Sequence, residues 1–329
     1  MRALILILMA SLPSLAQMTL TKASSEYELT DCGQFTPTHI NKAGQIVGWA
    51  LANGVSRLML CDQSGARDVG AGGPANAITQ RTTPAINERG DIVGVDGAGG
   101  FLQYADGQRI PLGSLVPTAV NAARQVVGYM PVGSVNHAVL WQHGGIMDIG
   151  LMLADTTVPS TAMDINDNGA VVGYFGAGES DTRGFVFYGG IQIIPYPVPA
   201  GRVYPLSVNN AGQVIGHWGG LSGRIHPFVW ENGVLTSLHD QWGVYSMALS
   251  INDKGRVAGF MPGGPGGDAC MWIGETQYNI STLIQPKPGA SWILGGAVGI
   301  NARGQIAASA TDSAGNVHAV LLTPLKQSR

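Results

Sequence analysis

Three histidines stand at the start of the same short phrase, and histidine is the side chain best suited to proton transfer and metal binding near neutral pH. His137 begins HAVLW, His226 begins HPFVW and His318 begins HAVLL. Phrases repeated this far apart indicate equivalent positions on separate structural repeats, which cannot bring three imidazoles to one metal ion. We therefore expect each of these histidines to be a hydrogen-bonded residue at the edge of a strand.

The segment from Asp164 to Gly169, DINDNG, matches the beginning of a calcium-binding loop, where oxygen ligands alternate along the chain before a glycine. The acid that completes such a loop at its twelfth position is missing, because Phe175 stands there. The equivalent segments elsewhere in the chain lack the leading Asp. We expect no metal site and no cofactor.

Motifs that mark catalytic sites are absent from the sequence. The chain contains no G-x-S-x-G elbow of a serine hydrolase, no H-E-x-x-H zinc helix and no phosphate-binding Walker loop. Its 21 acidic residues are spread along the whole length, so no pair of carboxylates for acid–base chemistry is marked. The prediction is that the protein is not an enzyme.

Composition describes the scaffold that must position any site. The 329 residues include 48 glycines, 45% hydrophobic residues and only 12% charged residues, a combination that excludes a disordered chain. The net charge is −3, and the 18 Lys and Arg form no basic stripe, which excludes a nucleic-acid binder. A folded, glycine-punctuated β protein is the class that remains.

The N-terminal residues have the features of a secretory signal. The chain begins Met-Arg, an apolar run covers residues 3–10, and small residues typical of a cleavage site lie at 14 and 16. The apolar run is far shorter than the roughly 18 residues that span a membrane. We expect residues 1–16 to be cleaved, which leaves residues 17–329 as a secreted, extracellular or periplasmic protein without a membrane anchor.

Three cysteines, Cys32, Cys61 and Cys270, follow the signal. An oxidising compartment permits disulfides, but an odd number leaves at least one thiol unpaired. The spacings fit no zinc pattern. Two interpretations stay open, namely three buried free cysteines or a Cys32–Cys61 bridge beside a free Cys270.

An internal repeat determines the expected fold. The phrase INKAGQIVG at residues 40–48 recurs in variants such as INDNGAVVG and VNNAGQVIG, always with Asn at its second position. Successive copies lie 34 to 49 residues apart, a period typical of propeller blades. Asn-x-x-Gly is turn chemistry, so these asparagines are expected to be structural turn residues rather than ligands. They are Asn41, Asn87, Asn121, Asn166, Asn209, Asn252 and Asn301.

Each repeat reads as four short antiparallel strands, and the two chain ends complete the count. The chain ends after a strand of the third type at 318–322 and begins with a strand of the fourth type at 27–33. The prediction is an all-β, seven-bladed β-propeller of four-stranded antiparallel blades, closed by an N-terminal outer strand that completes the last blade. The expected blades are roughly 36–70, 83–113, 118–150, 161–195, 204–239, 247–284 and 296–325 plus 25–33, in one domain.

The repeated IN-x-x-G-x-V-V-G phrase, followed by the His-Ala-Val-Leu-Trp type of phrase at 137–141, resembles the HAF family of bacterial extracellular repeats. The resemblance covers the whole chain after residue 16. The chain departs from it where Arg57, Gly100, Gly184 and Asp268 stand near the histidine position. The family implies an exported bacterial repeat protein and no particular reaction.

Loop lengths indicate where recognition would take place. The first–second and third–fourth connections of each blade are tight, whereas the other connections, such as 71–84, 195–205 and 217–225, are long and variable and lie on the opposite face. Variable loops on a rigid scaffold usually carry binding. The predicted ligand-binding residues on that face are Arg81, Arg202, Tyr204, Trp218, Arg224, Trp242 and Trp292.

The sequence therefore predicts a monomeric, exported binding module for an extracellular glycan or protein, with no nucleic-acid partner. Two alternatives stay open. A propeller enzyme of the glycan hydrolase or lyase type would need several acids converging in the central funnel. A structural surface protein would have no small ligand.

Overall fold

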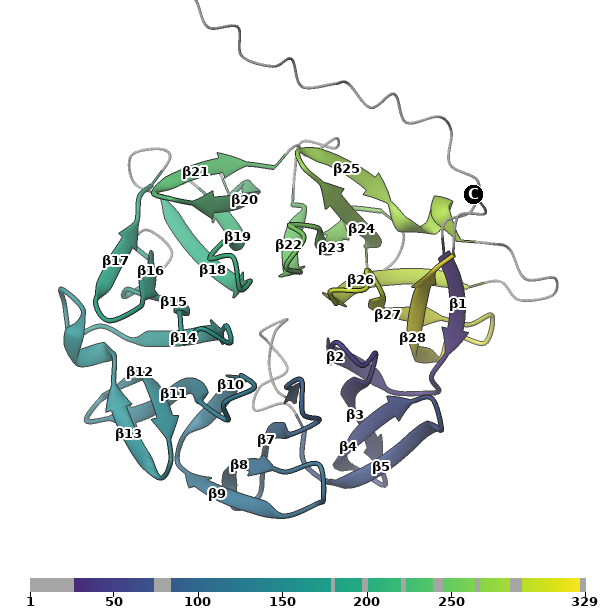
Figure 1. Ribbon diagram of the computed structural model, residues 1–329, viewed down its shortest axis with the longest axis horizontal. Helices are drawn as coiled ribbons and strands as arrows, with labels where there is room; N and C mark the ends of the chain where they lie inside the picture. Colours follow the sequence, from purple (N-terminus) through teal and green to yellow (C-terminus); the bar gives the residue numbers. More distant parts are fainter. Residues whose placement is uncertain are drawn as a thin grey trace, which may run out of the picture.

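The computed structural model describes residues 27–73, 84–178, 181–196, 201–219, 223–238, 245–263, 267–284 and 292–325. Seven four-stranded antiparallel sheets surround a central axis like the blades of a propeller (Figure 1). The predicted seven-bladed β-propeller is confirmed. Helix is limited here to the short 3-10 turns η1 (Gly150–Met152) and η2 (Ile280–Leu283). Within the described residues, no helix has the length and apolar character needed to cross a membrane.

The blades follow one another along the chain, and the first strand of each lies innermost (Figure 1). Blade 1 consists of β2 (Thr36–Ile40), β3 (Ile46–Ala52), β4 (Val55–Asp62) and β5 (Gly65–Ala71), and blade 2 of β6 (Ala85–Ile86), β7 (Ile92–Asp96), β8 (Gly99–Gln103) and β9 (Arg109–Gly113). Blade 3 consists of β10 (Val116–Val120), β11 (Val126–Val132), β12 (Val135–Gln142) and β13 (Gly145–Asp148), and blade 4 of β14 (Ser160–Ile165), β15 (Val171–Phe175), β16 (Arg183–Phe187) and β17 (Ile191–Ile194). Blade 5 consists of β18 (Arg202–Val208), β19 (Val214–Gly219), β20 (Ile225–Glu231) and β21 (Val234–Ser237), and blade 6 of β22 (Met247–Ile251), β23 (Val257–Met261), β24 (Asp268–Ile273) and β25 (Thr276–Asn279).

Blade 7 is built from both ends of the chain. Its inner strands are β26 (Ile293–Ile300), β27 (Ile306–Thr311) and β28 (Val317–Pro324), and its outer strand is β1 (Tyr27–Asp31). The purple β1 lies antiparallel beside the yellow β28 (Figure 1), which confirms the predicted closure. The pairing continues beyond β1, because Cys32 N–H donates to the Ala319 carbonyl at 2.9 Å.

A disulfide between Cys32 and Cys61 reinforces this closure. Cys32 follows β1 in blade 7 and Cys61 lies on β4 in blade 1, so the bridge joins the last blade to the first. Of the two interpretations that the sequence left open, the structure has the Cys32–Cys61 bridge. The spacing of cysteines could not decide this, because it does not report which blades are neighbours. Cys270 is buried on β24 and forms no disulfide with a described residue.

The first turn of each blade joins it to the next blade. In blade 4, Asn166 Oδ1 accepts hydrogen bonds from the backbone N–H groups of Asn168 and Ala170 and so closes its own turn. The Asn166 Nδ2 group donates across to the Asn209 carbonyl oxygen at 2.8 Å. All seven asparagines are buried, and their amides donate to the next Asn carbonyl at 2.8–3.1 Å in a closed circle, which we call the asparagine belt.

A glycine in the second strand allows the two inner strands to approach closely. A Cβ atom on Gly216 would lie 2.0 Å from the Tyr204 carbonyl oxygen, because β18 bulges toward β19 at this point. Blade 7 has Ala308 at the equivalent place, and there the facing strand has a wider irregularity, between Leu294 and Ala297. The one blade without the glycine thus has a different backbone at the contact.

The hydrophobic core is divided among the spaces between blades. Between blades 4 and 5, for example, Val172 of β15 packs with Val203 and Phe228 of blade 5. Because each blade contributes one face to the cluster before it and one to the cluster after it, no blade can bury its apolar residues alone. The ring must close for the end blades to be covered.

Candidate functional site

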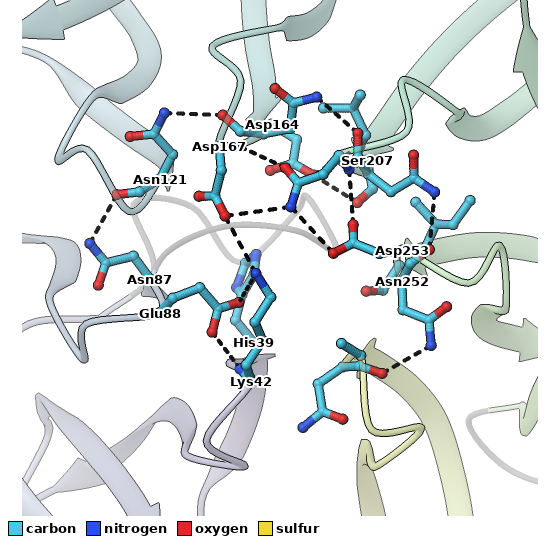
Figure 2. A pocket seen from close by; sticks show the side chains of 18 of the residues that line it. His39, Lys42, Asn87, Glu88, Asn121, Asp164, Asp167, Ser207, Asn252 and Asp253 are labelled. Atoms are coloured by element: carbon cyan, nitrogen blue, oxygen red, sulfur yellow. Dashed lines mark hydrogen bonds and ion pairs between the residues drawn. The ribbon is translucent and has the colours of Figure 1, made fainter.

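The central channel opens on two faces with different chemistry. We call the face that carries the first–second and third–fourth connections the turn face, and the opposite one the loop face. At the turn face the channel mouth is a hollow of about 160 Å³ (Figure 2). The residue after each belt asparagine lines it, namely Lys42, Glu88, Ala122, Asp167, Asn210, Asp253 and Ala302.

The acids at the turn-face mouth tie neighbouring blades together. Glu88 accepts the Lys42 backbone N–H at 2.6 Å, and Asp253 accepts the Asn210 N–H at 2.9 Å. The Lys42 ammonium lies 3.5 Å from an Asp167 oxygen, across the mouth (Figure 2). Burial raises the pKa of Glu88, and the Lys42 contacts oppose that shift. Acids thus converge in the funnel, but their oxygens are engaged in structural hydrogen bonds.

The calcium-like segment is also occupied by contacts between blades. Asp164 Oδ2 accepts hydrogen bonds from the Ser207 hydroxyl at 2.7 Å and the Val208 N–H at 3.1 Å, both in the next blade. Asn168 likewise donates to the Asn210 carbonyl. The described residues contain no group of three or more His, Cys, Asp or Glu side chains placed to hold a metal ion.

The loop-face end of the channel is aromatic at blades 4 and 5. Tyr174 on β15 and Tyr204 on β18 meet edge to face with ring centroids 5.0 Å apart, and His217 on β19 stacks on Tyr204 at 5.1 Å. The Tyr204 hydroxyl donates to the Thr182 hydroxyl at 3.4 Å. Tyr174 packs against an apolar cluster formed by Met163, Leu206 and Leu249 from the innermost strands. Burial raises the pKa of the Tyr174 hydroxyl.

His217 has an unusual environment within this aromatic row. Its Nδ1 atom is buried and has no hydrogen-bond partner in the described structure. Burial, and then the positive charge of Arg202, lower the pKa of His217 to about 4. The imidazole is therefore neutral near pH 7, and its buried ring nitrogen lacks the partner that buried polar groups normally have.

A second aromatic pair lies on the other side of the same blade. Trp218 on β19 and His226 on β20 stack with ring centroids 4.4 Å apart and an angle of 27°. The Trp218 indole N–H donates to the Ser237 hydroxyl at 3.0 Å. Tyr196, at the end of blade 4, packs against the same interblade cluster and donates from its hydroxyl to the Thr182 carbonyl.

Four of the seven residues predicted to bind ligand come together in blade 5. Arg202 and Tyr204 lie on β18, Trp218 lies on β19 and Arg224 directly precedes β20, all at the loop-face end. Trp292 instead precedes β26 in blade 7, where it packs against the core and meets His318 edge to face. Arg81 and Trp242 lie outside the described residues.

Sequence reasoning missed Tyr174 and His217 as members of the site. A signal was present in the repeat, because the residue after the second-strand glycine is aromatic or His in five blades, at Trp49, Tyr129, Tyr174, His217 and Phe260.

Long connections between the second and third strands occur in fewer blades than expected. The second–third connection is a two-residue turn in blades 1 to 3 and is long only in blades 4 to 7.

Comparisons with known proteins agree on the fold. No protein-family model matches the chain, and no curated protein matches it in sequence. The acylaminoacyl peptidase of Pyrococcus horikoshii is similar over 92% of this chain and 53% of its own, with a TM-score of 0.56 and 10% identity. A prolyl endopeptidase structure is similar over 92% and 51%, with a TM-score of 0.55 and 11% identity. The propeller domain of the Trilobed protease from Pyrococcus furiosus is similar over 77% and 85%, with a TM-score of 0.55 and 13% identity.

The chain spans about half the length of the peptidases that it resembles. At 10–13% identity the likeness is one of fold, so function has to be argued from the residues of this chain.

Proposed function

We propose that the protein is an exported binding module that holds an extracellular glycan or peptide on the loop face of blades 4 and 5. The observation that carries the proposal is the row formed by Tyr174, Tyr204 and His217, whose last member has a buried ring nitrogen without a hydrogen-bond partner among the described residues. A ligand polar group that reaches His217 Nδ1 would supply the missing hydrogen bond. Aromatic walls with few polar groups are typical of ligand sites.

We favour binding over catalysis because the acids at the turn face are already hydrogen-bonded within the fold, whereas the loop face presents polar groups that suit a ligand. The carboxylates that converge in the channel cap backbone N–H groups, so their lone pairs are used within the fold. The loop-face row of Tyr174, Tyr204 and His217 offers hydroxyl and imidazole groups on two neighbouring sheets, and these described residues form no nucleophile–base pair. Such a surface can orient a ligand and hold it.

Export is supported by the disulfide and by the N-terminal sequence. A structural bridge such as Cys32–Cys61 is stable in an oxidising compartment and is rare in the reducing cytosol. The signal-like residues 1–16 would deliver the chain to such a compartment.

The test is a screen of the chain lacking residues 1–16 on glycan and peptide arrays. A ligand found there should lose at least about tenfold in affinity with Tyr204→Ala, since the row loses its central ring. Tyr188→Ala is the matched control, because Tyr188 is 68% exposed and follows β16 at the turn face. Failure to bind on either array, or binding unchanged by Tyr204→Ala, would contradict the proposal.

A further inference from the structure

A cross-strand pair between the start of the third strand and the end of the fourth recurs around the ring, and we call it the clasp. In blade 3, His137 Nδ1 lies 2.9 Å from an Asp148 carboxylate oxygen. In blade 7, His318 Nδ1 lies 2.9 Å from Asp31. Blades 1 and 6 have the pairs Arg57–Asp68 and Asp268–Asn279 at the same register.

The strand register identifies the equivalent position in every blade. Val139 is paired with Asp148 in blade 3, and Phe228 is paired with Ser237 in blade 5. The register places Gly99 and Arg183, the neighbours of Gly100 and Gly184, at the histidine position of blades 2 and 4.

Blade 5 keeps the histidine of the clasp but lacks its carboxylate. His226 occupies the position of His137, whereas Ser237 replaces Asp148. The Ser237 hydroxyl accepts the Trp218 indole N–H instead, and His226 stacks on the Trp218 ring. The imidazole ring of His226 makes no hydrogen bond to a described residue. Its ring is half-buried and remains within reach of a ligand.

The surroundings of this open clasp are positively charged. Arg224 stands two residues before His226, on the same side of the strand by alternation, and is exposed. Among the described residues of blade 5 the single acid is Glu231, which lies at the turn-face end of β20. The nearby acid of blade 4, Asp181, interacts with Tyr196 and is paired with Arg183 at 3.1 Å. Charge complementarity therefore favours an anionic group here.

We infer that the open clasp is a subsite for a uronic acid residue of an acidic oligosaccharide. The ligand carboxylate would take the place that Asp148 and Asp31 take beside their histidines, hydrogen-bonded to His226 with Arg224 alongside. Trp218 stacks on His226, and Tyr196 packs against the same apolar cluster as Trp218. Their half-buried rings suit the C–H faces of a sugar better than an extended peptide. The inference rests on the proposed function, because it names the class of ligand.

The ligand arm of the test compares carboxylates with their esters. Tetrasaccharides of galacturonate, mannuronate and glucuronate, their methyl esters and neutral tetramers are titrated calorimetrically into the chain lacking residues 1–16. At least one uronate should bind more tightly than its own methyl ester by about tenfold or more. Equal affinity for acid and ester, or binding of poly-glutamate peptide with no uronate bound, would overturn the inference.

The protein arm restores or removes a clasp. Ser237→Asp provides blade 5 with the missing carboxylate, so it should reduce uronate affinity by about tenfold or more without lowering the melting temperature. His226→Phe keeps the stack on Trp218, removes the N–H groups and should lose a similar factor. Asp148→Ser is the matched control: it opens the clasp of blade 3, should lower the melting temperature and should leave uronate affinity within about twofold.

These outcomes separate the two proposals. A chain that binds nothing on the arrays contradicts the proposed function itself. A chain whose binding depends on Tyr204 but is unaffected by both Ser237→Asp and His226→Phe contradicts only the uronate subsite.

Discussion

The Asn301 side-chain amide donates a hydrogen bond to the Asn41 carbonyl oxygen at 3.0 Å, across 260 positions of sequence. This contact closes the asparagine belt between blade 7 and blade 1. It has the same geometry as the belt contacts between consecutive blades, for example the 2.8 Å bond from Asn166 to Asn209. The two blades that contain the chain ends are thus joined at the channel as firmly as any others.

Replacing a belt asparagine should destabilise the whole ring. Asn166→Ala removes both the cap of its own turn and the link to blade 5, and should cost about 1–3 kcal/mol because buried backbone groups lose their partners. Asn166→Asp keeps the capping oxygen, but it replaces the donor to Asn209 with a buried carboxylate oxygen facing a carbonyl, so it should be at least as destabilising as the loss of that bond. Asn168→Ala removes a more exposed interblade bond and should cost less. Urea unfolding measures all three, and equal stability of Asn166→Ala and wild type would contradict the prediction.

Breaking the disulfide should loosen the closure of the ring. Cys32→Ser or Cys61→Ser should lower the free energy of unfolding by about 2–4 kcal/mol, because the bridge closes a loop and holds blade 7 to blade 1. A reducing agent should lower the melting temperature of the wild type and should not change that of either variant. Removing all residues through Gly33 should have a larger effect, since β28 becomes an open edge that invites aggregation. A truncated chain that stays monomeric and equally stable would disprove the closure.

Acid should destabilise the protein through His217. The pKa of this group is about 6.5 when unfolded and about 4 when folded, so the unfolded chain binds the proton more readily. The stability that depends on neutral His217 is fully present above about pH 6.5. As the pH falls toward about 4, the free energy of unfolding should decrease by about 1–3 kcal/mol. His217→Gln should reduce the slope of melting temperature against pH in that window. A wild-type imidazole that titrates near 6.5 by NMR would show that this explanation is wrong.

The second-strand glycine should tolerate no side chain where the first strand bulges toward it. Gly216→Ala places a methyl group 2.0 Å from the Tyr204 carbonyl oxygen and should cost more than about 2 kcal/mol. The reverse change at the equivalent place, Ala308→Gly, should cost only about 1 kcal/mol, mainly through backbone entropy. Thermal melts of the two variants make the comparison, and equal losses would argue against a role for the bulge.

The sequence predicted the local parts of the fold and, from the strand types at its two ends, the pairing of β1 with β28. Asn-x-x-Gly turns and the strand that follows each one are specified within about ten residues, so their period revealed the blades. The Asn166–Asn209 bond and the Cys32–Cys61 bridge join different blades, and their geometry depends on how tightly the ring closes. Sequence spacing contains no information on that distance.

The same distinction applies to the candidate site, where residue types could be predicted from the sequence and contacts between strands could not. Tyr204 and Trp218 stand out as aromatic residues beside a long variable loop, so they could be proposed from sequence. His217 is notable because its buried Nδ1 has no hydrogen-bond partner in the described structure, and His226 is notable because Ser237 stands where blade 3 has a carboxylate. A missing partner becomes visible only when the strands are placed in register, as the comparison of Ser237 with Asp148 shows.

The closure also has a consequence for the order in which the molecule can mature. Among the described strands β1 is synthesised first, and its partner β28 is synthesised after all the others. Cys61 follows Cys32 by only 29 residues, so the bridge can form while most of the ring is still unmade. Once the bridge has formed, it holds β1 beside blade 1 until β28 pairs with it. The disulfide can therefore position β1 during folding, before the other three strands of blade 7 are in place.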